Sequence, residues 1–194
     1  MSVLRRPPVV ALSLVAYCAV MISLTMLKAY FVIGLLWRPE AQRHRSLELV
    51  PFAEFFHGGS WFGPLFGAVG NIGFFVPFGV LLYVLWHRRS RAVLDVTLAG
   101  AALSLVLESL QYAFSLGRTD VGDLVFNTVG AFLGALLARV LGPRLHPLWV
   151  GLSLVLALVF TVLVALGPRL GDLDKVVDLG ASVPGGVQSI GRTG

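Results

Sequence analysis

The chain has 194 residues, of which 57% are hydrophobic and 13% are charged, and its mean hydropathy is +0.86. A soluble domain carries about 25% charged residues, so this composition indicates an integral membrane protein with no room for a second sizeable domain. The formal charge of +5 comes from basic residues that flank apolar runs, where they control topology and contact anionic headgroups. We therefore expect membrane lipids as partners and no nucleic acid.

Five apolar segments are long enough to cross the roughly 30 Å hydrocarbon core as helices. They predict an all-α fold, a polytopic membrane helical bundle, within a membrane domain at residues 1–166. Residues 38–65 mix charged and aromatic side chains, as in an interfacial loop, and the glycine-rich residues 167–194 are typical of a flexible tail. The predicted spans lie at about 9–27, 66–86, 92–114, 120–141 and 148–166.

Glycines predict close helix packing in two of these spans. The fourth span contains Gly130 and Gly134 at GxxxG spacing, a packing pattern that is also common by chance in membrane helices. The second span contains four glycines that would admit a neighbouring helix, namely Gly67, Gly70, Gly73 and Gly79.

The basic residues near the span ends bear on orientation in the cell membrane. Lys and Arg are divided almost evenly between the two sides, so their count alone does not decide it. Arg5 and Arg6 precede the first span, and the short turn after the second span is densely basic at His87–Arg91. These two features favour a multi-pass protein with a cytoplasmic N-terminus.

Polar side chains interrupt the apolar pattern near one end of the second, third and fourth spans. Successive spans run in opposite directions, so the start of the second, the end of the third and the start of the fourth meet at the same side of the membrane. Residues three or four apart share a helix face, which would aim these groups at one point near the outer interface. The sequence therefore predicts a ligand-binding pocket formed by Asn71, Glu108, Gln111, Arg118, Asp120, Asp123 and Asn127.

Each of these residues also has a structural interpretation. Asp120 and Asp123 have capping-box spacing, which is typical of a helix start and offers a purely structural explanation for both at the start of the fourth helix. Arg118 would pair with a neighbouring acid, and the three amides (Asn71, Gln111, Asn127) would form hydrogen bonds between helices. Glu108 is hardest to explain in this way, because it lies about two turns inside its span and must be paired, protonated or facing water. It is the candidate catalytic residue if the protein is an enzyme.

Other chemistries have little support in the sequence. The four histidines lie in loops on both sides without metal-ligand spacing, and Cys18 is the single cysteine, within an apolar run. No nucleophile-elbow or phosphate-binding loop motif is present. We therefore expect no metal and no cofactor.

Several pieces of the chain, in order, resemble the VanZ-like family of bacterial integral membrane proteins. They are Leu49-Val-Pro51-Phe52, Asn71-Ile-Gly-Phe-Phe-Val-Pro77-Phe78-Gly79, Glu108-Ser-Leu-Gln111 and Arg118-Thr-Asp120-Val-Gly-Asp123-Leu-Val-Phe-Asn127-Thr-Val-Gly130. Glu48 departs from the asparagine that the family often has at that position. The family takes its name from a protein linked to resistance against the glycopeptide teicoplanin, so the resemblance implies a cell-envelope membrane protein without supplying a reaction.

Three functions remain open from the sequence. The first is an outward-facing polar pocket that binds a cell-envelope lipid, a lipid-linked wall precursor headgroup or a glycopeptide-type ligand, with Arg118 contacting an anionic group. The second is an intramembrane enzyme, a hydrolase or transferase acting on a lipid-linked phosphate, with Glu108 or the two aspartates as general base or metal ligands. The third, a small transporter, is less well supported because the chain has no evident inverted repeat.

Overall fold

The computed structural model of the chain describes residues 3–26, 45–48, 50, 52, 61–114 and 117–166. In this part of the chain, five helices are long and apolar enough to cross a membrane, which confirms the predicted all-helical membrane fold. A short 3-10 helix, η1 (Val3–Arg5), precedes them. The five helices are α1 (Pro7–Met26), α3 (Phe62–Trp86), α4 (Ala92–Phe114), α5 (Val121–Leu141) and α6 (His146–Leu166).

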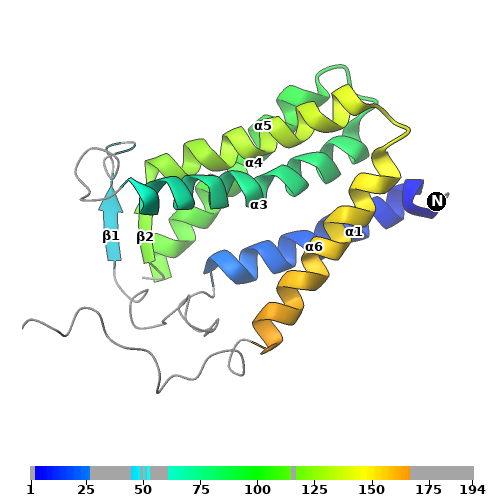
Figure 1. Cartoon of the computed structure of the whole chain (residues 1–194). Coiled ribbons are helices and arrows are strands. Elements are labelled where there is room, and N and C mark those ends of the chain that lie inside the picture. The colour runs from blue at the N-terminus through cyan, green and yellow to red at the C-terminus, as the bar shows by residue number, and fades with distance from the viewer. Residues whose placement is uncertain are drawn as a thin grey trace, which may run out of the picture.

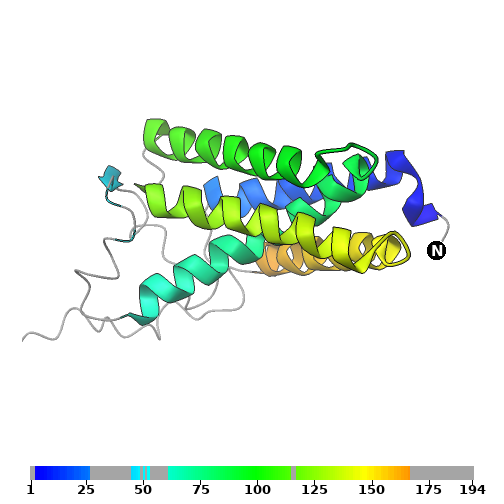
Figure 2. The ribbon, with the colours of Figure 1, turned by 90° about the horizontal axis from the view of Figure 1, so that it is seen from above.

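The helices form an up-and-down bundle in which α5 packs against both α3 and α4, while α1 packs against α3 and α6 (Figures 1 and 2). The starts of α3 and α5 and the end of α4 lie at the same end of the bundle (Figure 1). The N-terminus and the turn between α3 and α4 lie at the opposite end. This alternation of helix direction confirms the arrangement from which we predicted that the seven polar residues lie at one end of the bundle.

Helix α3 begins earlier than predicted. Residues 62–65, which we expected to be the last part of the interfacial loop, form its first turn. Pro64 is compatible with this position, because the amides of a first turn have no partner within the helix and a missing N–H costs little there. The earlier start places Asn71 well inside α3 and not near its beginning.

Small residues hold α3 and α5 together. A Cβ atom at Gly79 of α3 would collide with the backbone of Ala131 in α5, and one at Gly134 would collide with the backbone of Val76. Gly130 likewise faces the α3 backbone. These positions therefore need glycine because two backbones approach closely, which confirms the packing role predicted for the GxxxG pair and for Gly79.

No described helix makes such a close approach at the three earlier glycines of α3. A Cβ atom at Gly67, Gly70 or Gly73 would meet no atom within 4 Å in the described structure. The backbone contact with α5 lies further along α3, between Ile72 and Val80. Glycine content alone does not specify which part of a helix is in contact.

A two-stranded parallel sheet, absent from our predictions, connects two distant segments. Strand β1 (Arg45–Glu48) pairs with strand β2 (Gly117–Asp120), and the register places Glu48 beside Asp120. Strands this short have no detectable hydrophobic period. The rest of the predicted interfacial loop up to Trp61 is mostly outside the described residues, as is the predicted tail at 167–194.

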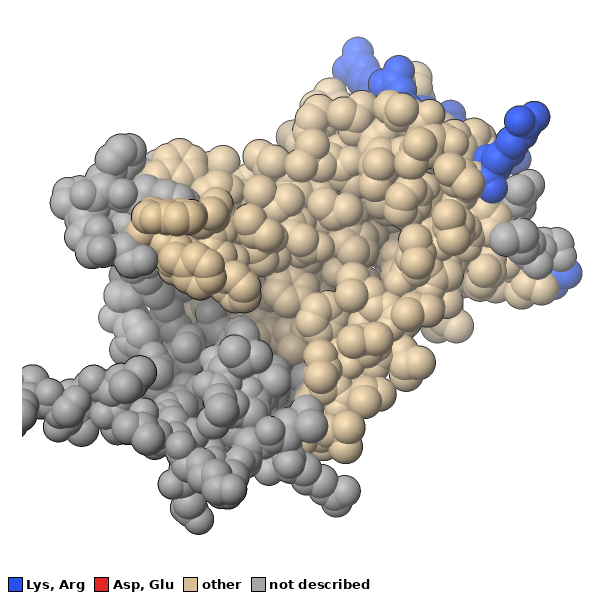
Figure 3. Space-filling model, in the orientation of Figure 1, with Lys and Arg blue, Asp and Glu red and all other residues tan. Residues whose placement is uncertain are grey.

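The interior of the bundle is apolar, and much of its outer surface is apolar as well. Tyr17 is almost fully buried, and its hydroxyl donates to the carbonyl of Phe74 in α3 over 2.9 Å. Large side chains such as Leu12, Leu98 and Leu158 point outward and are mostly exposed. Figure 3 shows a broad uncharged surface over the described helices, and the Lys and Arg side chains that it colours lie beyond this surface, at the end of the bundle that the structure describes. A broad apolar surface bordered by basic residues is expected for helices that face lipid.

Candidate functional site

Glu108 lies near the end of α4, and its side chain is only 8% exposed. Its carboxylate accepts a hydrogen bond from the backbone amide of Asp120 over 3.3 Å, and its carbonyl accepts one from the hydroxyl of Thr119 over 3.3 Å. Burying a carboxylate is costly unless it has partners. These bonds supply partners and attach β2 to the end of α4.

Asp120 is the N-cap residue of α5. Its backbone is extended, with φ −129° and ψ 127°, and its Oδ1 accepts from the amide of Gly122 over 2.7 Å. The bond satisfies one of the free amides at the helix start, and the negative charge suits the helix dipole. The capping interpretation of Asp120 is therefore confirmed, and the backbone of the same residue contacts Glu108.

Asn71 and Asp123 join α3 to α5. The Asn71 side-chain amide donates to Oδ1 of Asp123 over 2.6 Å, and both side chains are half-buried. Asp123 is in the first turn of α5, whereas Asn71 is well inside α3. The two helices are therefore staggered at this end, and α3 extends beyond the start of α5.

Two other predicted residues make separate interhelical bonds. The Asn127 amide donates to the hydroxyl of Ser104 in α4 over 2.9 Å, and both residues are buried. The Gln111 amide donates to the carbonyl of Thr25 in α1 over 3.1 Å. These bonds agree with the interpretation of the two amides as links between helices, and they do not test a role in ligand binding.

Arg118 lies in β2, and its side chain is outside the described part of the structure. Its predicted contact with an anionic group stays a prediction. The position of its backbone is nevertheless informative, because β2 follows α4 in the chain and leads directly into α5. The backbone of Arg118 thus lies in a paired strand, between Glu108 and Asp123 in the sequence.

The seven residues are therefore gathered at one end of the bundle, but they form several distinct pairs. Glu108 contacts the Asp120 backbone, and Asn71 contacts Asp123. Asn127 lies one helical turn further into the bundle than Asp123, and Gln111 bonds toward α1. We refer to the seven residues as the polar cluster.

Sequence reasoning missed Phe52 as a neighbour of this cluster. Its ring packs edge-on against Phe126 of α5, with 5.4 Å between centroids, and its amide lies near Gly122. Its φ of 64° is uncommon for a residue other than glycine, and such strain is often found near functional sites. The Leu-Val-Pro-Phe motif was the available signal, because it ends at this residue.

Glu48 and Ser104 were missed for different reasons. Glu48 reaches the cluster through the pairing of β1 with β2, which places it in register with Asp120. Ser104 sits in the middle of α4 among apolar residues and appeared to be ordinary packing surface. Within the described residues, no group of three or more His, Cys, Asp or Glu side chains is arranged to hold a metal ion.

Comparison with known proteins places the chain in a family. The sequence profile of VanZ/LLP1 matches residues 14–142, which contain all of the polar cluster. The chain belongs to the VanZ/LLP1 family. Its resemblance to VanZ-like proteins is thereby confirmed, and the match extends from α1 to the end of α5, so that α6 lies beyond it.

One curated relative illustrates the VanZ/LLP1 similarity. Protein VanZ of Enterococcus faecium is 37% identical over 90 residues, which is 46% of this chain and 50% of that protein. The match thus spans half the length of the curated relative. No solved structure matches the chain.

Proposed function

We propose that this VanZ/LLP1 protein binds the headgroup of a cell-envelope lipid, or of a lipid-linked wall precursor, at the polar cluster. The observation that carries the proposal is the burial of Glu108 against the residue that caps α5, at the same end of the bundle as the start of α5, where Asp123 pairs with Asn71. Acidic and amide side chains that extend into an apolar bundle from three helices are costly, and such groups usually mark a ligand site.

The chemistry of the cluster suits a headgroup that carries both an anionic group and hydroxyls or amines. The guanidinium of Arg118 would hold a phosphate or carboxylate by two bonds. The carboxylates of Glu108 and Asp123 would accept from hydroxyls or amines of a sugar or peptide. Apolar helix surface beside the cluster would accommodate the lipid tail.

The proposal also includes the orientation of the protein in the membrane. The basic residues before α1 and in the turn after α3 favour a cytoplasmic N-terminus. The polar cluster lies at the other end of the bundle, so it would open to the exterior, where wall precursors are used.

Native mass spectrometry of the purified full-length protein tests the proposal. We expect a lipid with a phosphorylated headgroup to be released from the wild-type protein and to be strongly reduced in Arg118→Ala. Arg144→Ala is the matched control, because Arg144 is exposed in the short connection between the end of α5 and the start of α6, whereas the polar cluster lies at the start of α5. Its lipid occupancy should equal that of the wild type.

Two outcomes would contradict headgroup binding as the function. Equal lipid occupancy in the wild type and in Arg118→Ala would show that the polar cluster is not the binding site. Conversion of an added lipid-linked phosphate to a product, abolished in Glu108→Gln, would instead establish the enzyme hypothesis.

A further inference from the structure

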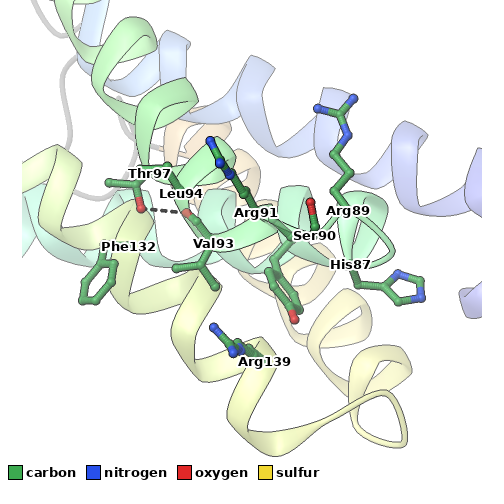
Figure 4. Close-up of a pocket in the computed structure, with 11 residues that line it drawn as sticks. His87, Arg89, Ser90, Arg91, Val93, Leu94, Thr97, Phe132 and Arg139 are labelled. Atoms are coloured by element: carbon green, nitrogen blue, oxygen red, sulfur yellow. Dashed lines mark hydrogen bonds between the residues drawn. The ribbon is translucent and has the colours of Figure 1, made fainter.

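A second site candidate lies at the opposite end of the bundle from the polar cluster. A cavity of about 560 Å³ opens between the turn that joins α3 to α4, the first turns of α4, and the last part of α5. Figure 4 shows its lining, in which α5 contributes Arg139 and Phe132 and the turn contributes Arg89, Ser90 and Arg91. We call this cavity the basic cavity.

The charged side chains that line the basic cavity are all positive. Its described lining includes three arginines and no acidic residue. Arg89 is already engaged, since it lies 3.6 Å from the carboxylate of Asp95 and 4.2 Å from the centre of the Trp86 ring. Arg91 and Arg139 form no side-chain ion pair or hydrogen bond with any other part of the described structure, and both are exposed. Two positive charges therefore remain available to an anion.

The backbone adds to this preference. Helix α4 begins at Ala92, and its first residues line the cavity. The start of a helix carries a partial positive charge, which favours an anion there. Ser90 and Thr97 also line the cavity, and the Thr97 hydroxyl donates to the carbonyl of Val93 over 2.8 Å (Figure 4).

One wall of the basic cavity is apolar and faces outward. Leu94 is 51% exposed and Phe132 is 40% exposed, and both line the cavity. Leu98, one turn further along α4, is 59% exposed. The lining of the cavity is therefore basic near the end of the bundle and apolar further along the helices, on the surface that would face acyl chains. This order of polar and apolar surface matches that of a phospholipid.

We infer that the basic cavity binds the phosphate of an anionic phospholipid, with Arg91 and Arg139 as its two charge partners. The phosphate lies between the α3–α4 turn and α5, and the first acyl methylenes lie against Leu94 and Phe132. Inorganic phosphate shares the charge but lacks the apolar part. The site is distinct from the polar cluster, so neither proposal depends on the other.

Competition between lipids tests this inference. The full-length protein is purified in a neutral detergent and titrated with phosphatidylglycerol, with phosphatidylcholine and with inorganic phosphate, and bound lipid is counted by native mass spectrometry. We expect one phosphatidylglycerol to bind in preference to phosphatidylcholine. Each of Arg91→Gln and Arg139→Gln should weaken its binding about fivefold, the effect of removing one basic residue near a lipid phosphate.

Two variants provide controls. Arg144→Gln removes an exposed arginine from the same end of the bundle without altering the cavity lining, and its binding should not change. Arg139→Lys keeps the charge and should retain most of the binding. If Arg139→Gln fails to fold, Arg91→Gln and Arg139→Lys still decide the matter.

The outcomes separate the possible ligands. Displacement of phosphatidylglycerol by inorganic phosphate at similar concentration would show that the apolar wall contributes nothing to binding, and it would overturn the assignment of the cavity to a phospholipid. An equal loss of phosphatidylglycerol binding in Arg144→Gln and Arg91→Gln would show that the lipid is attracted by the basic surface in general, and it would overturn the inference. Unchanged binding in both cavity variants would overturn it too.

Discussion

The Asn71 amide of α3 donates to the Asp123 carboxylate of α5 over 2.6 Å, at the end of the bundle where α4 also ends. This bond extends the α3–α5 contact beyond the glycines that bring the two backbones together. The same end holds Glu108, which accepts from the amide that precedes α5. Polar side chains from three helices thus stabilise one end of an otherwise apolar bundle.

The Asn71–Asp123 bond predicts an energetic coupling between the two helices. Asn71→Ala and Asp123→Ala should each lower the free energy of unfolding, and the double variant should lose less than the sum. We expect a coupling of about 0.6 to 1.7 kcal/mol, as found for hydrogen bonds between membrane helices. The measurement is reversible unfolding in mixed micelles, and strictly additive losses would contradict the pairing.

Glu108 should tolerate loss of its charge better than loss of its oxygen atoms. The amide oxygen in Glu108→Gln can still accept from the Asp120 backbone, whereas Glu108→Ala leaves that buried amide without this acceptor. The alanine variant should be less stable than the glutamine variant by about 1 to 3 kcal/mol. Unfolding of the two purified variants measures this difference, and equal stability would show that the Asp120 amide does not need Glu108.

The close approach of α3 and α5 predicts opposite outcomes at two glycines. Gly134→Ala places a methyl group against the backbone of Val76 and should destabilise the protein by about 1 to 3 kcal/mol. Gly73→Ala is the matched control within α3, because a Cβ there meets no described atom within 4 Å. Its thermal midpoint should stay the same or rise slightly, and a similar fall in both variants would argue against the observed packing.

The proposed orientation predicts which positions are reachable from outside the cell. In a Cys18→Ser background, an Arg118→Cys variant should react with a membrane-impermeant maleimide in intact cells. Ser90→Cys, in the exposed basic turn, should react only after lysis. The reverse pattern would place the polar cluster on the cytoplasmic side and exclude an external ligand.

The sequence predicted the parts of this structure that follow from hydrophobic length and from alternating helix direction. The prediction of five spans was enough to place Glu108, Asp120 and Asp123 at one end of the bundle, because that placement depends only on the order of the helices. The Asp120 cap was also foreseen, since it rests on local spacing.

Other features required contacts between distant segments. The pairing of β1 with β2 is such a contact, and it alone brings Glu48 beside Asp120. The separation of the cluster into pairs depends on helix rotation, which spacing along one helix does not determine. Asn71 pairs with Asp123, while Asn127 turns toward Ser104.

A structure of the protein in nanodiscs made from its native membrane lipids would test headgroup binding at the polar cluster most directly. We predict density for a phosphorylated headgroup beside Arg118, within hydrogen-bonding distance of Glu108 or Asp123. Acyl-chain density against Glu108, or a headgroup bound only elsewhere on the bundle, would contradict the proposal.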